Sequence, residues 1–420
     1  MHLARVGVPV RAVNVSGTGF GDGVRCVLPS RRVTRSRLAV TALCLLWLAI
    51  GLANVARGLG AVGPDYWRWA FSHHSYSDLL TLYSPRYLDG AHPLPYFADR
   101  IEYPPLLGFA LWLPAFAPGG PAAYLAVSAL FLAACLAVTL RSLALLPGAS
   151  SWWLAATPAL SYYAFLNWDL LPIALLAGAL LALERGRTAR SGALAALGVA
   201  AKLFPAALAP AAFGALASTG RRPLVHWTAV AAAVLLAVNL PLALFAFDGW
   251  SWFFRYNAAR GAENSVWHAL GGPSGRALDL ASLGPVALAG LFALWGAWSC
   301  GRRGGDASRA ARLGTAFTLV TWIALNKVWS PQYALYGFLA GALAAAPGWL
   351  FAALTAISIA DYHLEFEVRA RDWDPWFVET LVKPSELLRT GLWLVLAAWI
   401  GAVLWRELVR QPRVSSPSAR

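Results

Sequence analysis

Charged residues are scarce in this chain of 420 residues, and their scarcity is the first constraint on its fold. Asp, Glu, Lys and Arg together make up 13% of the sequence, whereas soluble globular domains carry about 25%. Hydrophobic residues make up 59%, and the mean hydropathy is +0.56. These values exclude an ordinary soluble globule and predict an integral membrane protein that crosses the bilayer many times.

Cysteine and cofactor-binding motifs are also sparse. The chain has four cysteines, which are Cys26, Cys44, Cys135 and Cys300. Their spacing is not typical of a metal site, and the pair His73–His74 is too isolated to predict one. The sequence has neither a G-x-x-x-x-G-K-[ST] loop nor a G-x-G-x-x-G motif. We therefore expect no disulfide framework, no metal site, no resident cofactor and no nucleotide chemistry.

Lysine is the third shortage. Only three of the 34 basic residues are lysines, namely Lys202, Lys327 and Lys383. Against so strong a preference for arginine, a retained lysine can indicate a need for a compact ammonium group, with chance as the alternative.

The net charge of +14 does not indicate nucleic-acid binding, because the arginines flank hydrophobic segments and are typical of anchors at the inner membrane surface.

Twelve hydrophobic segments are the predicted membrane spans. They are 38–56, 121–141, 152–166, 169–183, 191–203, 204–218, 224–246, 277–299, 313–326, 332–345, 347–360 and 386–405. Several are shorter than the roughly 20 residues that a full crossing needs. The apolar stretch Pro104–Pro118 is short and bounded by proline, so we predict a re-entrant or interfacial element there. The fold class is an all-α integral membrane bundle of about 12 transmembrane helices with a long first outer loop.

The charges separate onto two sides when the chain is threaded through these spans. The arginine-rich connections 184–190, 221–222 and 301–312 share one side with both termini. The positive-inside rule makes this the cytoplasmic side of the plasma membrane. The predicted parts are a basic cytoplasmic leader of residues 1–37, expected to be disordered, a transmembrane domain of residues 38–405, and a cytoplasmic tail of residues 406–420.

The outer side carries the acidic residues. The predicted outer loops are 57–120, 247–276 and 361–385, and the first and last of these hold eleven of the 20 acids. In the first loop, Asp78 follows the first span and Glu102 precedes a Tyr-Pro-Pro turn that leads into apolar sequence. A carboxylate at the membrane surface can deprotonate an acceptor hydroxyl, as a glycosyl transfer from a lipid-linked donor requires. The alternative is a solvated loop with scattered acids.

Three separated stretches carry a resemblance to a known family. They are the loop from Asp78 to Pro105, the run that includes Asn167–Asp169, Glu184–Arg187 and Ala201–Pro205, and the turn Asn326–Tyr333. Together they resemble the GT-C membrane glycosyltransferases, and most closely glycosyltransferase family 87, over roughly residues 75–335. The resemblance implies an extracytoplasmic active site and a polyprenyl-phosphate sugar, most simply polyprenyl-phosphomannose, as the donor. It implies a lipid or glycan acceptor and no requirement for a divalent metal.

The same resemblance assigns roles to individual residues. It places the catalytic base on Asp78, with Glu102 and Asp65 as alternatives. Lys202 and Lys327 would bind the donor phosphate, because a lysine at the outer end of a span is costly unless it faces a partner or a polar cavity. The alternative for both is an interfacial lysine that extends toward lipid headgroups.

The remaining candidates would contact the sugar or the acceptor. They are Tyr83, Tyr103, Asn167, Asp169, Gln332, Tyr333, Trp252, Arg255 and His363. Asp169 could instead cap the helix that follows it. Trp252 and Arg255 could belong to an interfacial aromatic belt, and His363 could be an ordinary loop histidine.

Two other classes of protein stay open at this point. A transporter or lipid flippase would also need many spans, although its polar residues usually lie within broken helices at the middle of the bilayer. A structural membrane protein without chemistry is the third hypothesis, and the clustered outer acids and aromatic residues count against it. Arabinofuranose is the alternative sugar to mannose.

Overall fold

The computed structural model describes residues 31–409, and their side chains from Leu38 onward. Within this part of the chain every regular element is a helix and no strand forms, which confirms the all-α prediction. Residues 1–30 of the predicted leader and residues 410–420 of the predicted tail lie outside the described residues. Helix α1 (Arg31–Ala56) begins inside the predicted leader.

The helices that follow α1 differ widely in length. They are α2 (Tyr66–Ser72), α3 (Asp78–Tyr87), α4 (Pro105–Trp112), α5 (Gly120–Leu145), α6 (Trp152–Ala155), α7 (Ala159–Tyr163), α8 (Leu170–Glu184), α9 (Thr188–Ala201), α10 (Leu208–Thr219), α11 (Arg221–Phe245), α12 (Phe247–Ala259), α13 (Val266–Ala269), α14 (Gly275–Arg302), α15 (Ala307–Leu325), α16 (Ala334–Ala344), α17 (Gly348–Ala370), α18 (Pro375–Phe377) and α19 (Lys383–Val409). Short 3-10 turns lie at Leu59–Ala61, Leu113–Phe116, Phe204–Ala207 and Pro331–Tyr333, and a π-helical turn lies at Val378–Val382.

Five helical segments of the described chain are long and apolar enough to cross a membrane. They are Leu38–Ala61, Gly120–Leu145, Arg221–Phe245, Gly275–Arg302 and Pro375–Val409. Shorter apolar helices lie at Pro105–Phe116, Leu170–Glu184 and Phe204–Thr219. These helices indicate a membrane protein, while the number of twelve spans stays a prediction.

Two predicted segments differ from the observed helices. The segment 152–166 is divided into α6 and α7, because Pro158 cannot continue the hydrogen bonding of α6 and instead precedes the first turn of α7. Residues 361–370 continue α17, so the expectation of a loop that begins at residue 361 is wrong there. The acids of this stretch are tolerated in a buried helix because Asp361 pairs with Arg389 of α19.

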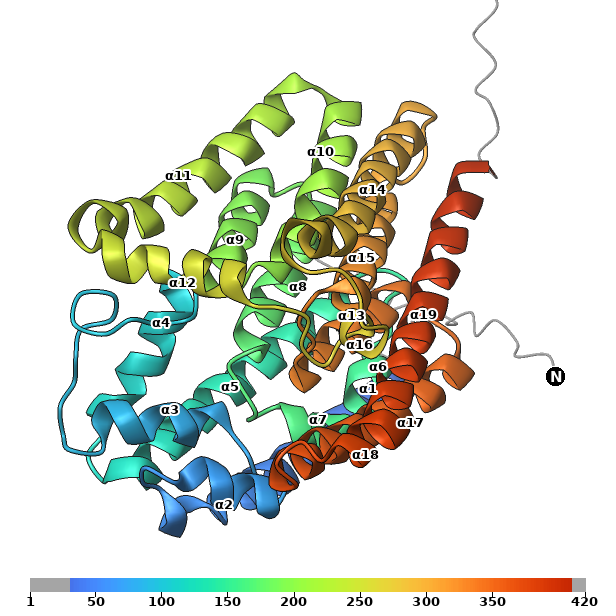
Figure 1. Cartoon of the computed structure of the whole chain (residues 1–420). Helices are drawn as coiled ribbons and strands as arrows, with labels where there is room; N and C mark the ends of the chain where they lie inside the picture. The colour runs from blue at the N-terminus through green and yellow to red at the C-terminus, as the bar shows by residue number, and fades with distance from the viewer. Residues whose placement is uncertain (1–30, 410–420) are drawn as a thin grey trace, which may run out of the picture.

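Small residues allow the central helices to approach closely. A Cβ atom on Gly214 of α10 would lie 2.1 Å from the carbonyl oxygen of Leu294 in α14, and one on Gly314 of α15 would lie 2.8 Å from the Cβ of Ala293. Such positions are typical of helix packing in membranes, where contact between backbones replaces the hydrophobic driving force. Helices α10, α14 and α15 therefore pack side by side, as Figure 1 shows.

The segments between the long helices form a layer of short helices on one side. Figure 1 shows α2, α3 and α4 together at the lower left, with α12 lying across the end of α11 above them. Helix α12 rests on the first loop, because a Cβ on its Gly249 would lie 1.9 Å from the carbonyl oxygen of Tyr96. The predicted outer loops 57–120 and 247–276 are thus packed against each other.

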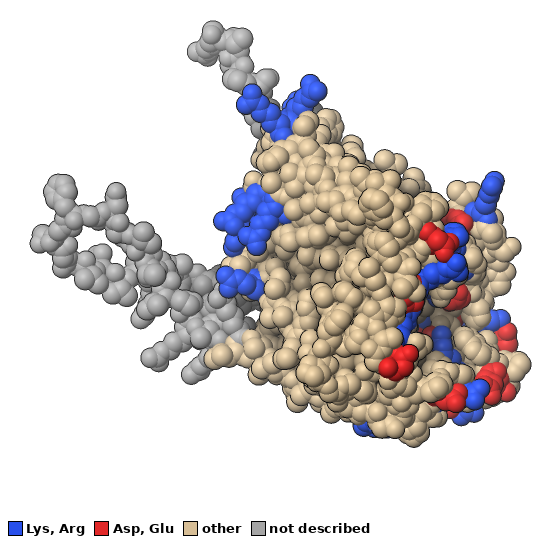
Figure 2. Space-filling view, turned by 90° about the vertical axis from the view of Figure 1, so that its left-hand side faces the viewer, with Lys and Arg blue, Asp and Glu red and all other residues tan. Residues whose placement is uncertain are grey.

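The charged residues on the surface are unevenly distributed. In Figure 2, Lys and Arg gather without Asp or Glu on the left and at the top, and the visible Asp and Glu lie on the right together with further Lys and Arg. A broad band without charged residues lies between them, and the acid-bearing face is hollowed. This arrangement matches a bilayer-spanning body with two chemically different ends.

Candidate active site

A cavity of about 420 Å³ lies where the first loop meets the ends of α9 and α15. Stretches from the first loop to the turn after α15, distant in the sequence, line it. Its polar and charged lining residues are Tyr76, Asp78, Glu102, Tyr103, Asn167, Lys202, Tyr256, Asn257, Arg260, Asn326, Lys327, Ser330, Gln332 and Tyr333. Eight of the residues predicted from the sequence are among them: Asp78, Glu102, Tyr103, Asn167, Lys202, Lys327, Gln332 and Tyr333.

The backbone around Asp78 is fixed from two directions. Ser77 is the N-cap of α3, and its side chain accepts a hydrogen bond from the Leu79 amide at 3.2 Å. The Ser77 hydroxyl also donates to the carbonyl of Phe165 at 2.5 Å, and the Asp78 amide donates to the carbonyl of Leu166 at 2.8 Å. The first turn of α3 is therefore held against the segment that precedes α8.

The carboxylate of Asp78 is held by neutral donors. The Tyr76 hydroxyl donates to its Oδ1 at 2.7 Å, and the Asn167 amide and the Tyr103 hydroxyl donate to its Oδ2 at 2.6 Å and 3.4 Å. Asn167 Nδ2 also lies 2.8 Å from the Tyr103 hydroxyl oxygen, which links the two groups that face Oδ2. No Lys, Arg or His of residues 38–409 forms an ion pair with Asp78.

This environment makes Asp78 a stronger base than an exposed aspartate. Burial raises the pKa of Asp78 above its ordinary value, and the nearby Glu102 raises it further. Hydrogen bonds from Tyr76 and Asn167 and the charge of Lys202 oppose that rise in the pKa. A carboxylate with a raised pKa accepts a proton more readily while it remains oriented by its donors.

Lys202 faces the cavity next to a buried acid. Helix α9 ends at Ala201 and Lys202 is extended, because Pro205 in the following turn does not continue the helix. The Nζ of Lys202 lies 2.6 Å from Oδ1 of Asp169, and the ammonium group lies 6.0 Å and 5.2 Å from the ring centroids of Tyr103 and Tyr333. The ammonium is thus held at the cavity wall.

The same contact shows where Asp169 lies. Its side chain is fully buried and does not line the cavity. It is the N-cap residue of α8 but makes no side-chain hydrogen bond to the first turn of that helix, so the capping alternative rests on the helix dipole alone. Asp169 instead orients Lys202 and balances its charge.

Two further cations line the cavity, and each also has an acidic partner. The Nζ of Lys327 lies 2.9 Å from Oδ1 of Asp279 in α14. The guanidinium of Arg260 pairs with Glu263, whose backbone bonds to Lys327 and Trp329 tie this loop to the turn that follows α15. The turn and the loop therefore bring Lys327 and Arg260 to the same wall of the cavity.

The two alternatives to Asp78 occupy different environments. Glu102 lines the cavity, but its Oε2 lies 3.3 Å from the guanidinium of Arg86, which also pairs with Asp99 at 2.5 Å. Asp65 lies outside the cavity with its side chain 76% exposed, 3.7 Å from Arg68. Asp78 lines the cavity and has no cationic partner within residues 38–409, so the geometry favours Asp78 as the base.

Four predicted substrate-binding residues lie away from this cavity. Tyr83 is buried against Tyr124, with the ring centroids 4.9 Å apart. Arg255 pairs with Asp248 at 2.5 Å on α12, where Trp252 also lies. His363 sits on α17, with its Nδ1 2.8 Å from that of His74. The sequence placed these residues in the predicted outer loops. Whether a residue of an outer loop lines this cavity depends on the direction of its side chain, which the sequence does not give.

Several lining residues were not among the predictions. Tyr76, Asn257 and Trp322 were not predicted, and Tyr256, Arg260, Asn326 and Ser330 lie in the stretches 247–276 and Asn326–Tyr333 without having been assigned a role. Tyr76 stands two residues before Asp78, so a search for hydroxyl donors beside the predicted base could have found it. The others come from turns of α12 and α15, and nothing in the sequence indicates that these turns meet the first loop.

The polar cavity adjoins an apolar groove between α10 and α14. A second cavity of about 540 Å³ shares Leu283 and Trp322 with it and is lined by Pro210, Val286 and Gly290 among others. A third cavity of about 350 Å³ shares residues of α10 and α14 with the second. Leu283 is 51% exposed, so the groove is open at the side of the molecule. The site suits a ligand with a polar head and a long apolar chain.

No cluster of three or more His, Cys, Asp or Glu residues that could hold a metal lies in residues 31–409. The expectation that no divalent metal is required stays a prediction. The cations already present at the cavity wall are Lys202, Arg260 and Lys327, and they can balance the charge of an anionic ligand without one.

Comparison with known protein families gives a match over the middle of the chain. The family model described as glycosyltransferase family 87 matches residues 102–323, which is more than half of the chain. No curated protein matches it. The matched range includes Glu102, Asn167 and Lys202, whereas Asp78 and Lys327 lie outside it and reach the same cavity through the fold.

Proposed function

The chain belongs to glycosyltransferase family 87 and is a membrane glycosyltransferase; on that premise we propose that it transfers mannose from a polyprenyl-phosphate donor to a lipid or glycan acceptor on the extracytoplasmic face of the plasma membrane. The observation that carries this proposal is that the polar cavity adjoins the apolar groove, with Leu283 and Trp322 lining both. Membership of the family also favours an enzyme over the transporter or flippase alternative.

The donor would occupy both parts of the site. Its isoprenoid chain would lie in the groove between α10 and α14, where packing against the helices replaces contact with lipid tails. Its phosphate would lie beside Lys202 and Lys327, which already have Asp169 and Asp279 as partners. The phosphate would therefore join two oriented ion pairs, and Arg260 adds a third cation at the same wall.

The reaction needs one base and one leaving group. Asp78 accepts the proton of the acceptor hydroxyl, and the hydroxyl oxygen attacks the anomeric carbon of the donor sugar. The bond between that carbon and the phosphate oxygen breaks, and polyprenyl phosphate leaves with the electron pair. A single displacement of this kind inverts the anomeric carbon, so a β-linked donor gives an α-linked product.

The neutral donors around Asp78 support this role. Tyr76 and Asn167 fix the direction of the carboxylate through bonds of 2.7 Å and 2.6 Å, and the raised pKa of Asp78 favours proton uptake from a hydroxyl. Glu102 lies nearby with Arg86 as its partner. This arrangement suits a residue that contributes to the electrostatic potential of the cavity rather than one that accepts the proton of the acceptor hydroxyl.

A transfer assay tests the proposal. Purified protein is incubated with radiolabelled polyprenyl-phosphomannose or polyprenyl-phosphoarabinofuranose and a panel of lipid and glycan acceptors, with Asp78→Asn and Glu102→Gln in parallel. We expect mannosyl transfer that Asp78→Asn lowers by roughly 100-fold to 10,000-fold without loss of donor binding, and a smaller loss with Glu102→Gln. Transfer of arabinofuranose alone would overturn the choice of sugar, and full activity of Asp78→Asn would overturn the choice of base.

A further inference from the structure

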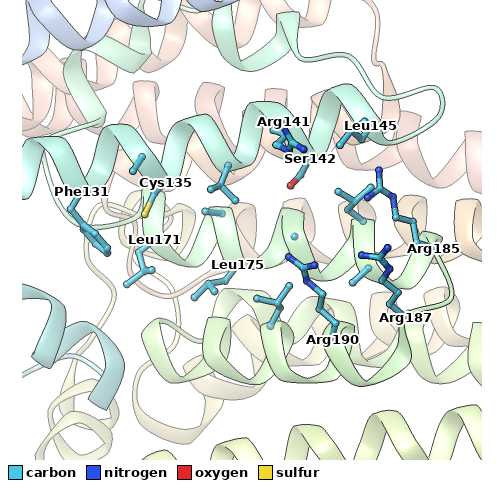
Figure 3. A pocket seen from close by; sticks show the side chains of 17 residues that line it. Phe131, Cys135, Arg141, Ser142, Leu145, Leu171, Leu175, Arg185, Arg187 and Arg190 are labelled. Atoms are coloured by element: carbon cyan, nitrogen blue, oxygen red, sulfur yellow. The ribbon is translucent and has the colours of Figure 1, made fainter. Parts of the chain in front are cut away.

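A separate groove of about 610 Å³ lies between α5, α8 and α9, away from the candidate active site. One face of α5 lines it with Phe131, Cys135 and Val138, and one face of α8 lines it with Leu171 and Leu175. These positions recur every three or four residues, so each helix presents a continuous apolar stripe to the groove. Figure 3 shows Phe131, Cys135, Leu171 and Leu175 together in one half of it.

The other half of the groove carries four arginines from α5, α9 and the turn between α8 and α9. Arg141 comes from α5, Arg185 from the end of α8, Arg187 from the turn that follows, and Arg190 from the first turns of α9. In Figure 3 they lie at the same end of the groove, beside Ser142. This end belongs to the predicted inner side of the membrane, opposite the cavity that contains Asp78.

These arginines lack acidic partners within the described part of the chain. None of the four forms an ion pair there, and no Asp or Glu lines the groove. The neighbouring Glu184 lies 3.9 Å from Arg312 on α15 instead. Four guanidinium groups at one site repel each other unless anions compensate their charge, so the site is electrostatically complementary to an anionic group.

The apolar half of the groove identifies the kind of anion. Phe131 and Val138 are 36% and 50% exposed on α5, which is one of the helices long and apolar enough to span a membrane. The groove therefore opens sideways toward lipid chains, and its arginines lie where phospholipid headgroups end. A soluble phosphate compound would use the arginines and leave the apolar stripe without a ligand.

We propose that this groove binds one anionic phospholipid of the predicted inner leaflet. Its phosphate lies among Arg141, Arg185, Arg187 and Arg190, and an acyl chain follows the stripe from Val138 to Phe131. The site is independent of the glycosyl-transfer cavity, and the proposal does not rest on the donor, the acceptor or the base assigned there.

Lipid binding to the purified full-length protein tests this site. The protein is delipidated in detergent, titrated with phosphatidylglycerol or phosphatidylcholine, and examined by native mass spectrometry. We expect saturable binding of one phosphatidylglycerol. The variant Arg187→Ala/Arg190→Ala should weaken that binding by roughly tenfold or more, since each basic residue near a lipid surface contributes about 1 kcal/mol.

A matched pair of arginines provides the control. Arg221 and Arg222 begin α11 on the same predicted side, and neither lines the groove. The variant Arg221→Ala/Arg222→Ala removes the same charge and should leave the affinity for phosphatidylglycerol within about twofold. Equal losses in the two double variants would overturn the proposal and leave only a general attraction of anionic lipid. Equal binding of phosphatidylcholine by the unmodified protein would also overturn it, because the groove would then show no preference for an anionic headgroup.

A third variant tests the apolar half without a change in charge. Ala134→Trp fills the groove from the exposed face of α5 and should also weaken binding by roughly tenfold. It keeps the test decisive if the arginine variant does not fold. Glycerol 3-phosphate at millimolar concentration should not displace the lipid; displacement by it would overturn the assignment to a lipid. Stronger binding of polyprenyl phosphate than of phosphatidylglycerol would likewise overturn it, in favour of a second substrate site.

Discussion

Asp78 is distinguished from the other acids near the cavity by the groups that surround it. Asp169, Asp279 and Glu263 each face a cation, whereas the carboxylate of Asp78 is bound by two hydroxyl groups and one amide. A carboxylate without a cationic partner keeps its affinity for a proton. At the residue scale, the partner of each acid therefore separates the proposed base from the acids that orient lysine and arginine.

The pH dependence of activity should reflect this environment. Only the ionised form of Asp78 accepts a proton, so kcat/KM should rise with pH through the pKa of Asp78. Because burial raises that pKa above its ordinary value, the acidic limb should lie above the pH at which an exposed aspartate titrates, about 4. The measurement is kcat/KM from acidic to neutral pH in detergent.

A tyrosine variant tests the sign of this effect. The hydrogen bond from Tyr76 lowers the pKa of Asp78, so Tyr76→Phe should move the acidic limb further toward high pH. Tyr83→Phe is the control, because Tyr83 lies in the neighbouring helix turn without contact to the Asp78 carboxylate. A limb that stays in place in Tyr76→Phe, or moves to lower pH, would contradict the assignment of the limb to Asp78.

Lys202 should contribute to stability as well as to catalysis. Lys202→Met leaves the fully buried Asp169 without its partner, which should lower the free energy of unfolding by about 3 kcal/mol. Lys383→Met is the matched control, because Lys383 pairs only with the largely exposed Glu379 and should change stability by less than about 1 kcal/mol. Thermal unfolding in detergent measures both.

A double variant separates the two roles of Lys202. Lys202→Met with Asp169→Asn removes both charges and should recover part of the lost stability without restoring transfer activity. Recovery of activity in the double variant would show that Lys202 serves only to balance Asp169, and the proposed contact with the donor phosphate would then be wrong.

At the scale of elements, the groove between α10 and α14 makes a specific prediction about the donor chain. Ala287 lies exposed on α14 and lines the groove. Ala287→Phe should raise KM for a long-chain polyprenyl donor several-fold and leave kcat nearly unchanged, because it obstructs the chain and not the reacting atoms. Steady-state kinetics with long-chain and short-chain donors measures the effect.

The neighbouring residue supplies the control for this variant. Leu288 is 69% exposed and does not line the groove, so Leu288→Phe should leave KM unchanged for both donors. An equal rise in KM for the short-chain donor in Ala287→Phe would argue against a chain in this groove and for an indirect effect on the cavity.

Hydrophobic segments predicted most of the helices because apolar composition alone decides which segments avoid water. The break within residues 152–166 and the helical continuation past residue 361 were missed for another reason. Pro158 interrupts an apolar run that remains buried, and the acids of residues 361–370 look like a loop until their partners, such as Arg389, are known. Such pairings join residues far apart in the sequence, and composition carries no information about them.

The candidate site shows the same limit. Asp78, Lys202 and Lys327 were predicted because their stretches resemble a family, and the structure brings all three to one cavity. The partners Asp169 and Asp279 could not be assigned, since side-chain direction in a helix depends on neighbours that the sequence does not identify. The apolar groove was also missed, because it exists only where α10 and α14 lie side by side.

At the scale of the whole molecule, the separation of charges predicts how the protein lies in the membrane. Figure 2 shows acidic residues on one side and Lys and Arg without acidic neighbours on the other. The cavity is lined by Asp78 and Glu102, and the second groove by four arginines that have no acidic partner within residues 38–409. If arginine-rich connections stay in the cytoplasm, then Asp78 must face the outer side. The donor phosphate and the proposed phospholipid would then bind at opposite surfaces of the same bilayer.

Labelling of single cysteines in whole cells measures this orientation. With the native cysteines replaced, Ala91→Cys in the first loop should react with a membrane-impermeant maleimide in intact cells, because Ala91 is exposed on the predicted outer side. Thr219→Cys, exposed at the end of α10, should react only after the membrane is permeabilised. The reverse pattern would place Asp78 in the cytoplasm, where a nucleotide sugar would become the expected donor. Reaction of both cysteines in intact cells would contradict the division of the surface into two sides, on which the placement of both lipid sites depends.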